Sequence, residues 1–449
     1  MGGVVKIADV SDFISPSQAC ILPMPGQSES KSNLVKLRKK TERPVLQEQK
    51  ITVSLKDCLA CSGCVTTAET VLIQSQTADE MLAGLSSSKV GFVTVSPQAL
   101  ASLAAELELT MGEMARVLAK FFKSKGAEFV VDSSFGRYFS LLECLEELKD
   151  KLRNRKKKEM LMSGICPGFV CYSEKRKKND VVPYISSIRS PQAVMGVLIK
   201  DYLVRKLSKS VENIYHVAVM PCYDKKLEAS RGEFGSSVGQ DTDCVVTPSE
   251  LLPLIKEFRC DEDIQVDTEM TWLNSLELGC VIGDYEDETS GGYTKFILDS
   301  LTQTLTEENQ LVDVQTESQN DLERYTINMK NGETLTLVKA YGFRNIQNLV
   351  RRITQGRHEV DYVEVMACPK GCLNGGGQIR NPEPALQDIR VNKVKEVYKQ
   401  ANQRDLLEQQ YKEVRDEWQS LNPEYRQLLT AKIQHVQPPA ANSVAAMAW

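Results

Sequence analysis

The chain has 449 residues, of which 42% are hydrophobic and 26% are charged, and its formal net charge at pH 7 is −5. This length exceeds what a single hydrophobic core usually holds, so we expect more than one lobe. The acidic balance argues against nucleic acid as the main ligand, since phosphate binding needs a basic surface, and no apolar run is long enough to cross a bilayer.

From about residue 88, short β-branched runs alternate with longer helical stretches, the pattern of an α/β domain. The predicted strands lie at 90–95, 128–132, 159–164, 214–220, 243–247 and 361–366, and the predicted helices at 97–124, 136–154, 191–207, 248–258 and 342–355. Residues 323–340 predict a hairpin that turns at Asn331-Gly332, and residues 389–433 predict charged helix. We divide the chain into an N-terminal region at 1–87 with a linker and a cysteine-rich motif, a domain at 88–435 and a flexible tail at 436–449.

The chain carries 13 cysteines but only three histidines, which are His216, His358 and His435. Its start lacks the basic segment and cleavage site of a secretory signal, so we expect a cytosolic protein that can also enter the nucleus. In that compartment 13 cysteines do not fit a disulfide framework. Any metal centre must be held mainly by thiolates, which favours iron–sulfur clusters or zinc.

The first candidate cysteine set is the run Asp57-Cys58-Leu-Ala-Cys61-Ser-Gly-Cys64. Ferredoxins use such C-x2-C-x2-C runs to hold [4Fe–4S] clusters, and a glycine inside the run allows a tight wrap. The run supplies three thiolates, because Ala68 stands where a ferredoxin has its fourth cysteine. The nearest spare cysteine is Cys20, and we hypothesise that it completes the site. The alternative is a zinc site, although three closely spaced cysteines without a nearby histidine are a poor ligand set for zinc.

The second candidate set comes from three places where a hydrophobic run leads into a cysteine next to a proline. These are Cys166-Pro167, Pro221-Cys222 and Cys368-Pro369, and the third adds Cys372 and the glycine-rich segment 374–378. Ligands of open α/β sheets collect outside the carboxyl ends of strands, so these cysteines can converge on one point. For any one of them alone, a buried structural thiol is the alternative. The remaining cysteines, which are Cys144, Cys171, Cys244, Cys260 and Cys280, lack this pattern and are read as core or surface thiols.

At these motifs the sequence resembles the catalytic domain of iron-only hydrogenases. The matching stretches are Cys166-Pro-Gly-Phe, Ser190-Pro-Gln, Met220-Pro-Cys222-Tyr-Asp-Lys225-Lys-Leu-Glu228, Ser290-Gly-Gly-Tyr and Met366-Ala-Cys368-Pro-Lys-Gly-Cys372 with the glycines after it. More closely, the chain resembles the NARF-like family of cytosolic iron–sulfur assembly, on the first cysteine run, the start Phe13-Ile-x-Pro-x-Gln-x-Cys20 and the final Trp449.

The resemblance implies two α/β lobes with a cluster between them, plus a small N-terminal ferredoxin-like cluster motif. It implies one [4Fe–4S] cluster on Cys20, Cys58, Cys61 and Cys64, and a second, buried one on Cys166, Cys222, Cys368 and Cys372. Family members link an early scaffold of NTPases to a targeting complex, with a WD40-repeat protein, that loads recipient apoproteins. An aromatic C-terminus such as Trp449 is expected to dock on that complex, and the alternative is a tail that contacts nothing.

One departure from the hydrogenases bears on activity. They have a further cysteine just before the one that matches Cys166, and it relays protons, whereas this chain has Ile165. Lys225 and Glu228 are retained, but the two also suit a structural ion pair. We therefore expect no catalytic residues and no hydrogenase activity. An assembly factor, an electron-transfer protein and a redox enzyme remain the competing functions, and the cysteine spacings alone do not separate the first two.

Overall fold

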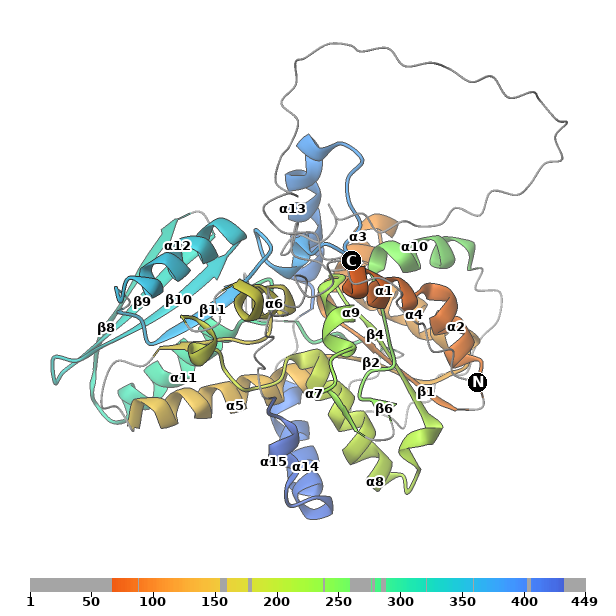
Figure 1. Ribbon diagram of the computed structural model, residues 1–449, viewed down its shortest axis with the longest axis horizontal. Coiled ribbons are helices and arrows are strands. Elements are labelled where there is room, and N and C mark those ends of the chain that lie inside the picture. Colours follow the sequence, from red (N-terminus) through yellow and green to blue (C-terminus); the bar gives the residue numbers. More distant parts are fainter. Residues whose placement is uncertain are drawn as a thin grey trace, which may run out of the picture.

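The computed structural model describes residues 67–431, except 88, 154–159, 177–179, 237–238, 259–275, 277–278, 284–287, 320, 358 and 402–404. Its strands are β1 Val90–Val95, β2 Ala127–Asp132, β3 Leu161–Met162, β4 Ile214–Val219, β5 Gly235–Ser236, β6 Gly239–Gln240, β7 Cys244–Val246, β8 Leu311–Gln319, β9 Leu322–Met329, β10 Thr334–Tyr341 and β11 Tyr362–Met366. The predicted α/β class is confirmed, with two main sheets that lie side by side (Figure 1).

Helices cover both sheets. They are α1 Thr67–Ser75, α2 Ala78–Leu85, α3 Pro97–Leu107, α4 Met111–Ser124, α5 Ser134–Arg153, α6 Pro167–Arg176, α7 Pro191–Val197, α8 Val204–Lys206, α9 Asp224–Ala229, α10 Pro248–Glu257, α11 Tyr293–Glu307, α12 Phe343–Thr354, α13 Gln387–Tyr398, α14 Asp405–Leu421 and α15 Tyr425–Leu428. None of these described helices combines the length and the apolar character that a bilayer span requires.

The first sheet, sheet A, has four parallel strands in the order β2-β1-β4-β7. Its central strands, β1 and β4, are almost entirely buried, as expected for a parallel sheet that has helices on both faces. Alternate residues of β1 separate the two faces. Val93 and Val95 pack with α3, α4 and α10, whereas Phe92 packs with α5, α7 and Trp418.

The second sheet, sheet B, has the order β3-β11-β10-β9-β8 and is mixed. Strands β3, β11 and β10 are parallel, while β9 and β8 run antiparallel to their neighbours. Leu337 faces α11 and Val338 faces α12, so these helices cover opposite faces of the sheet. The predicted hairpin is confirmed as β9 and β10, and Gly332 takes the positive φ of 83° that the turn needs.

Two predicted helices are interrupted. The helix expected at 97–124 is two helices, because Glu108 adopts a left-handed conformation and Thr110 opens α4 with a capping box to Glu113. The helix expected at 191–207 contains a π-helix, η3, at Leu198–Leu203 between α7 and α8. The strand expected at 159–164 is only the two-residue β3.

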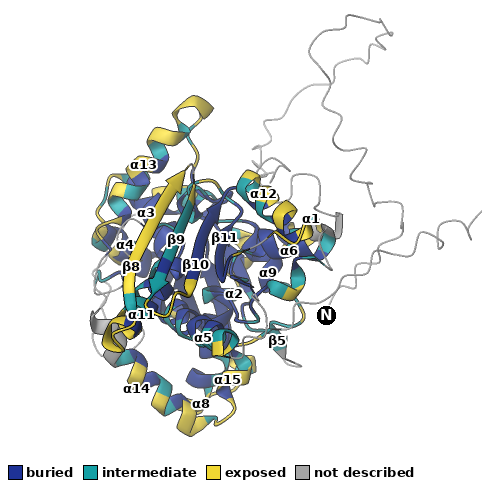
Figure 2. Cartoon of the chain, turned by 90° about the vertical axis from the view of Figure 1, so that its left-hand side faces the viewer, coloured by how far each residue is buried: buried dark blue, intermediate teal, exposed yellow. Residues whose placement is uncertain are grey.

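The predicted charged helical segment near the C-terminus is confirmed as α13, α14 and α15. Helices α14 and α15 pack beneath α5 and α7 in Figure 1, and Trp418 of α14 is completely buried there. The Trp418 indole N–H donates a hydrogen bond of 2.8 Å to Asp201. In sheet B, β11 is buried throughout and β10 is buried except at its first residue, whereas β8 is exposed on both faces (Figure 2).

Candidate metal centre

Four cysteines line one cavity between the two sheets. Cys222 follows the carboxyl end of β4 in sheet A, whereas Cys166 follows β3 and Cys368 follows β11 in sheet B. Cys372 opens a short 3₁₀ helix, η6 (Cys372–Asn374), after a turn in which Gly371 has a φ of 77°. The cavity has about 80 Å³ of open space, well above the roughly 10–15 Å³ that one water needs. The predicted convergence of strand-end cysteines is therefore observed.

The thiols are half-buried because they face this cavity. Burial raises the pKa of the Cys222 thiol well above its ordinary value, and negative charge on Asp224 and on the other three cysteines raises it further. Burial likewise raises the pKa of the Cys166 and Cys368 thiols. The four thiols thus lie close enough that a thiolate at one of them disfavours deprotonation of the others. A positively charged metal centre would reverse this, and metal binding would release protons.

The arrangement fits a multi-iron cluster better than a single ion. Among the described residues, no three His, Cys, Asp or Glu side chains are placed to hold one metal ion. A zinc ion needs four ligand atoms that converge on one point, at about 2.3 Å for sulfur. A cubane instead offers a different iron atom to each thiolate, so its ligands surround a volume. Four thiols around a shared cavity match the ligand arrangement of a cubane.

Backbone groups next to the cysteines are placed to support them. The amide N–H of Ala367 donates to Cys166 Sγ at 3.4 Å, and the amide of Cys372 donates to Ser290 Oγ at 2.8 Å. Donors to ligating sulfurs stabilise the negative charge of a cluster. Ser290 was not predicted from the sequence as a site residue, although it opens the Ser-Gly-Gly-Tyr motif.

The glycine-rich segment after Cys372 crosses from sheet B to sheet A. The amide of Gly377 donates to the Pro221 carbonyl at 2.9 Å, next to Cys222. A Cβ atom at Gly375 would collide with the same carbonyl. Gln378 Nε2 donates to the Gln98 carbonyl in α3 at 2.9 Å. The glycine-rich segment therefore allows close backbone contact between the loop that carries Cys372 and the loop that carries Cys222.

Lys225 also lines the cavity, and its positive charge is paired with a carboxylate. Lys225 Nζ lies 2.8 Å from Glu228 Oε2 and donates to Ser190 Oγ at 2.8 Å and to the Ile165 carbonyl at 3.3 Å. Gln192 Nε2 donates to the Lys225 carbonyl at 3.1 Å. Lys225 and Glu228 thus form the ion pair that their spacing allowed. The Ile165 side chain also lines the cavity and is buried.

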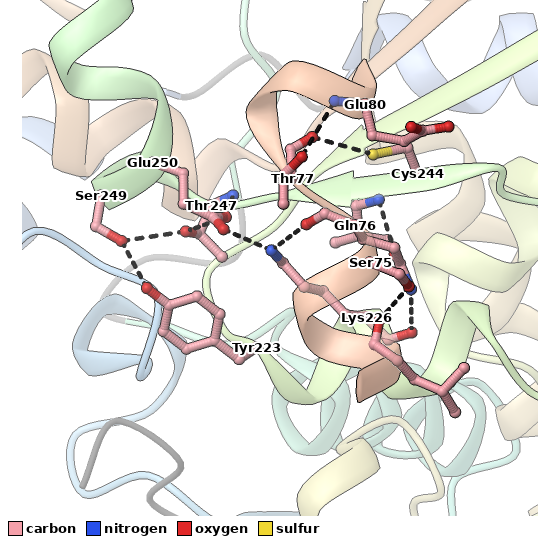
Figure 3. Close-up of polar contacts among 12 residues, drawn as sticks. Ser75, Gln76, Thr77, Glu80, Tyr223, Lys226, Cys244, Thr247, Ser249 and Glu250 are labelled. Carbon is pink, nitrogen blue, oxygen red and sulfur yellow. Dashed lines mark hydrogen bonds and ion pairs between the residues drawn. The ribbon is translucent and has the colours of Figure 1, made fainter. Parts of the chain in front are cut away.

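A second polar network, which we call the corner clamp, joins Gln76, Lys226 and Glu250 (Figure 3). Lys226 Nζ lies 2.6 Å from Glu250 Oε1 and donates to the Gln76 carbonyl at 2.6 Å. The Gln76 side chain donates through Nε2 to the Lys226 carbonyl at 2.9 Å, and its Oε1 accepts from the Val245 backbone N–H at 3.0 Å. The clamp holds the corner between α1 and α2 against α9, the helix that follows Cys222. It was not predicted from the sequence, although Thr247 and Glu250 have capping-box spacing.

The remaining predicted residues divide into two groups. Cys144 and Cys244 are buried and Cys171 and Cys280 half-buried, and none of the four lines the cavity. The first cysteine set, which is Cys20, Cys58, Cys61 and Cys64, lies outside the described residues, as do Cys260 and Trp449. Helix α1 begins three residues after Cys64.

Comparisons with known proteins show the family to which the chain is similar. A family model described as "Iron only hydrogenase large subunit, C-terminal domain" matches residues 89–376. The "Probable cytosolic Fe-S cluster assembly factor oxy-4" of Caenorhabditis elegans is 42% identical over 443 residues, which cover 95% of this chain and 95% of that protein. "Cytosolic iron-sulfur assembly component 3" of Mus musculus is 40% identical over 404 residues, with 85% of each chain covered.

Solved structures share the fold at lower identity. The [FeFe]-hydrogenase HydA1 from Chlamydomonas reinhardtii superposes with a TM-score of 0.61 at 22% identity, over 79% of this chain and 97% of that one. At this identity the similarity concerns the fold alone. The predicted hydrogenase-like architecture is therefore confirmed.

Proposed function

Because the chain belongs to the family of cytosolic iron–sulfur cluster assembly factors built on the iron-only hydrogenase large-subunit domain, we propose that it binds iron–sulfur clusters and acts in the assembly of cytosolic iron–sulfur proteins. The observation that carries the proposal is the set of four cysteines from two sheets around one cavity. The names of the relatives support the cytosol as the site of action, and action in the nucleus is a further part of the proposal.

We propose that Cys166, Cys222, Cys368 and Cys372 hold a resident [4Fe–4S] cluster. Such a cluster supplies one-electron chemistry, and its potential depends on burial and on hydrogen bonds to its sulfurs. The chain contributes half-buried thiols and the Ala367 amide as a donor to Cys166. Ligands from one loop of sheet A and two loops of sheet B favour retention of the cluster, because its loss would leave all three loops without their common partner.

A second [4Fe–4S] cluster is proposed on Cys20, Cys58, Cys61 and Cys64. Two residues separate Cys64 from Thr67 at the start of α1, so Cys64 is tethered within about 10 Å of that helix end. The corner clamp holds α1 and α2 beside α9, just after Cys222. The two sites are therefore proposed as neighbours, with the first cluster as the exchangeable one.

Hydrogen turnover is not part of the proposal. Ile165 offers a buried alkyl side chain to the cavity, and an alkyl group cannot carry a proton. Lys225 is held by Glu228 and Ser190. After anaerobic reconstitution the chain should evolve no hydrogen, and clear turnover would contradict this part of the proposal.

For partners, we propose the early scaffold NTPases and the targeting complex with its WD40-repeat protein. The contact with the targeting complex would be made by Trp449, since an aromatic anchor in a pocket is a common binding hot spot. Deletion of Trp449 should weaken co-purification with that complex, whereas Met447→Ala should not. Equal binding by the truncated and full-length chains would remove Trp449 from the proposal.

The cluster proposal is tested by anaerobic reconstitution of the full chain. Two cubanes require about eight iron and about eight sulfide per chain. Cys222→Ser and Cys372→Ser should each lose about half of the iron, and Cys171→Ser, a half-buried cysteine away from the cavity, should lose none. Full iron content in both cavity variants would overturn the assignment.

The second candidate function is electron transfer, since two neighbouring clusters could pass electrons. Depletion of the protein in cells separates the alternatives. An assembly factor predicts that cytosolic iron–sulfur enzymes lose activity and iron while mitochondrial ones keep both. Intact cytosolic clusters, with loss of one redox pathway only, would favour electron transfer.

A further inference from the structure

Strand β8 forms an open edge of sheet B. It is nine residues long, and every residue from Val312 to Gln319 is exposed (Figure 2). The other edges of the two main sheets differ. Strand β3 has two residues, β7 has three buried ones, and most of β2 is buried. Among the described strands, β8 alone is a long edge that no element covers.

An open edge presents unpaired backbone N–H and C=O groups over its whole length. For nine residues this row is about 30 Å long, and such a row can pair with an added strand. No proline interrupts β8, and its single irregularity lies at the first end, between Leu311 and Asp313. Val312 and Val314 are 59% and 37% exposed, so apolar side chains also accompany the edge.

The segment that contains β8 is acidic. Between Lys295 and Arg324 the chain contains no lysine or arginine. It contains seven acidic residues, which are Asp299, Glu307, Glu308, Asp313, Glu317, Asp321 and Glu323. Two of these, Asp313 and Glu317, lie on β8 itself, on the same face as Gln315. Arg324 of β9 lies opposite Glu317, and the edge keeps a negative charge at Asp313.

This charge disfavours a second copy of the chain as the occupant. Antiparallel pairing of two β8 strands about Gln315 would place Asp313 opposite Glu317 twice. In-register parallel pairing would set each acidic residue beside its own copy. Like charges directly opposite each other destabilise a strand pair, so the edge is complementary to a basic strand and not to itself.

We propose that β8 is a docking edge for an extended basic segment of a partner protein, which adds a strand to sheet B. The segment would place lysine or arginine on the face of Asp313 and Glu317. On the face of Val314 and Thr316 it would place β-branched residues. Backbone pairing would supply affinity, and the alternate side chains would supply selectivity. This site is distinct from the cysteine cavity and does not depend on iron.

The test uses the full chain and the labelled peptide Thr-Lys-Val-Lys-Val-Arg-Val-Lys-Thr, with binding followed by fluorescence anisotropy. A peptide with glutamate in place of its basic residues and one with the same residues in blocks are the controls. The alternating basic peptide should bind, protect β8 amides from hydrogen exchange, and bind equally with and without iron. The two control peptides should bind at least about tenfold more weakly.

Matched variants of the chain decide the location. Asp313→Lys with Glu317→Lys should weaken the basic peptide about tenfold and gain binding of the acidic one. Glu257→Lys with Glu383→Lys makes the same charge change at exposed positions elsewhere and should alter neither. The proposal would be overturned if both double variants lost the same affinity for the basic peptide, or if the block peptide bound as tightly as the alternating one. It would also be overturned if no peptide bound saturably at millimolar concentration, or if sedimentation showed a dimer formed through β8.

Discussion

Replacement of Lys226 by methionine should destabilise the corner clamp. The Lys226 ammonium group is buried, lies 2.6 Å from Glu250 Oε1, and donates to the Gln76 carbonyl at 2.6 Å. Methionine keeps much of the aliphatic volume and removes the charge and the donors. The substitution therefore isolates the polar part of the contact between α9, α10 and the corner of α1 and α2 (Figure 3).

The magnitude depends on the groups that remain unpaired. A buried ion pair that loses one partner costs about 3–5 kcal/mol, and a buried carbonyl without its donor costs about 1–3 kcal/mol. Glu250 keeps two partners, since its other oxygen accepts from the Thr247 amide at 2.9 Å and hydroxyl at 2.8 Å. We therefore expect a total loss of unfolding free energy of about 4 kcal/mol, at the lower end of the sum of these two ranges.

The assay is a double-mutant cycle of Lys226→Met, Glu250→Gln and the combined variant. Because a two-lobed chain need not unfold in one step, local stability is measured by hydrogen exchange of the α9 and β7 amides. The combined variant should be less destabilised than the sum of the single ones, with a coupling of about 2 kcal/mol. Lys206→Met, which breaks an exposed pair with Glu417, should cost at most about 1 kcal/mol. If Lys226→Met lowered the local unfolding free energy no more than Lys206→Met does, or showed no coupling to Glu250→Gln, the clamp would not stabilise this corner.

Two further predictions concern His216 and Gly375. Burial lowers the pKa of His216 from 6.5 to about 4, so the folded state keeps it neutral, and stability worth about 3 kcal/mol is lost as the pH falls from about 6.5 to about 4. His216→Gln should flatten this part of the curve of unfolding free energy against pH, and an unchanged slope would contradict the assignment. Gly375→Ala should push the Pro221 loop away and lower iron retention in the cavity. Gly232→Ala, where an added Cβ meets nothing within 4 Å, should leave iron content unchanged.

The strand ends were predictable because three hydrophobic runs stop at a cysteine next to a proline. A β-branched run marks a buried parallel strand, and the fold rule for open α/β sheets then places the residues after each strand at one edge. The sheet that each strand joins was not predictable in this way. Cys222 comes from sheet A and Cys166 from sheet B, and that division depends on long-range pairing that no local pattern records.

The missed elements have physical reasons of their own. Strand β8 is exposed on both faces, and its apolar residues after Leu311 are limited to Val312 and Val314, so the alternation is too short to mark a strand clearly. The break between α3 and α4 did leave a signal in Thr110 and Glu113, which have capping-box spacing, but the apolar period continues across it. The corner clamp depends on Gln76 and Lys226, 150 residues apart, and polar residues without a partner in sequence give no such signal.

The two cysteine sets differ in what their clusters would do for the fold. The cavity set joins sheet A through Cys222 to sheet B through Cys368 and Cys372, so a cluster there acts as a cross-link between lobes. Its binding free energy is then partly free energy of lobe association. Contacts such as that of Gly377 with Pro221 already hold the loops together, which favours a preformed site. The first set relies mainly on one local run, and we expect its cluster to be the one that leaves without separating the sheets.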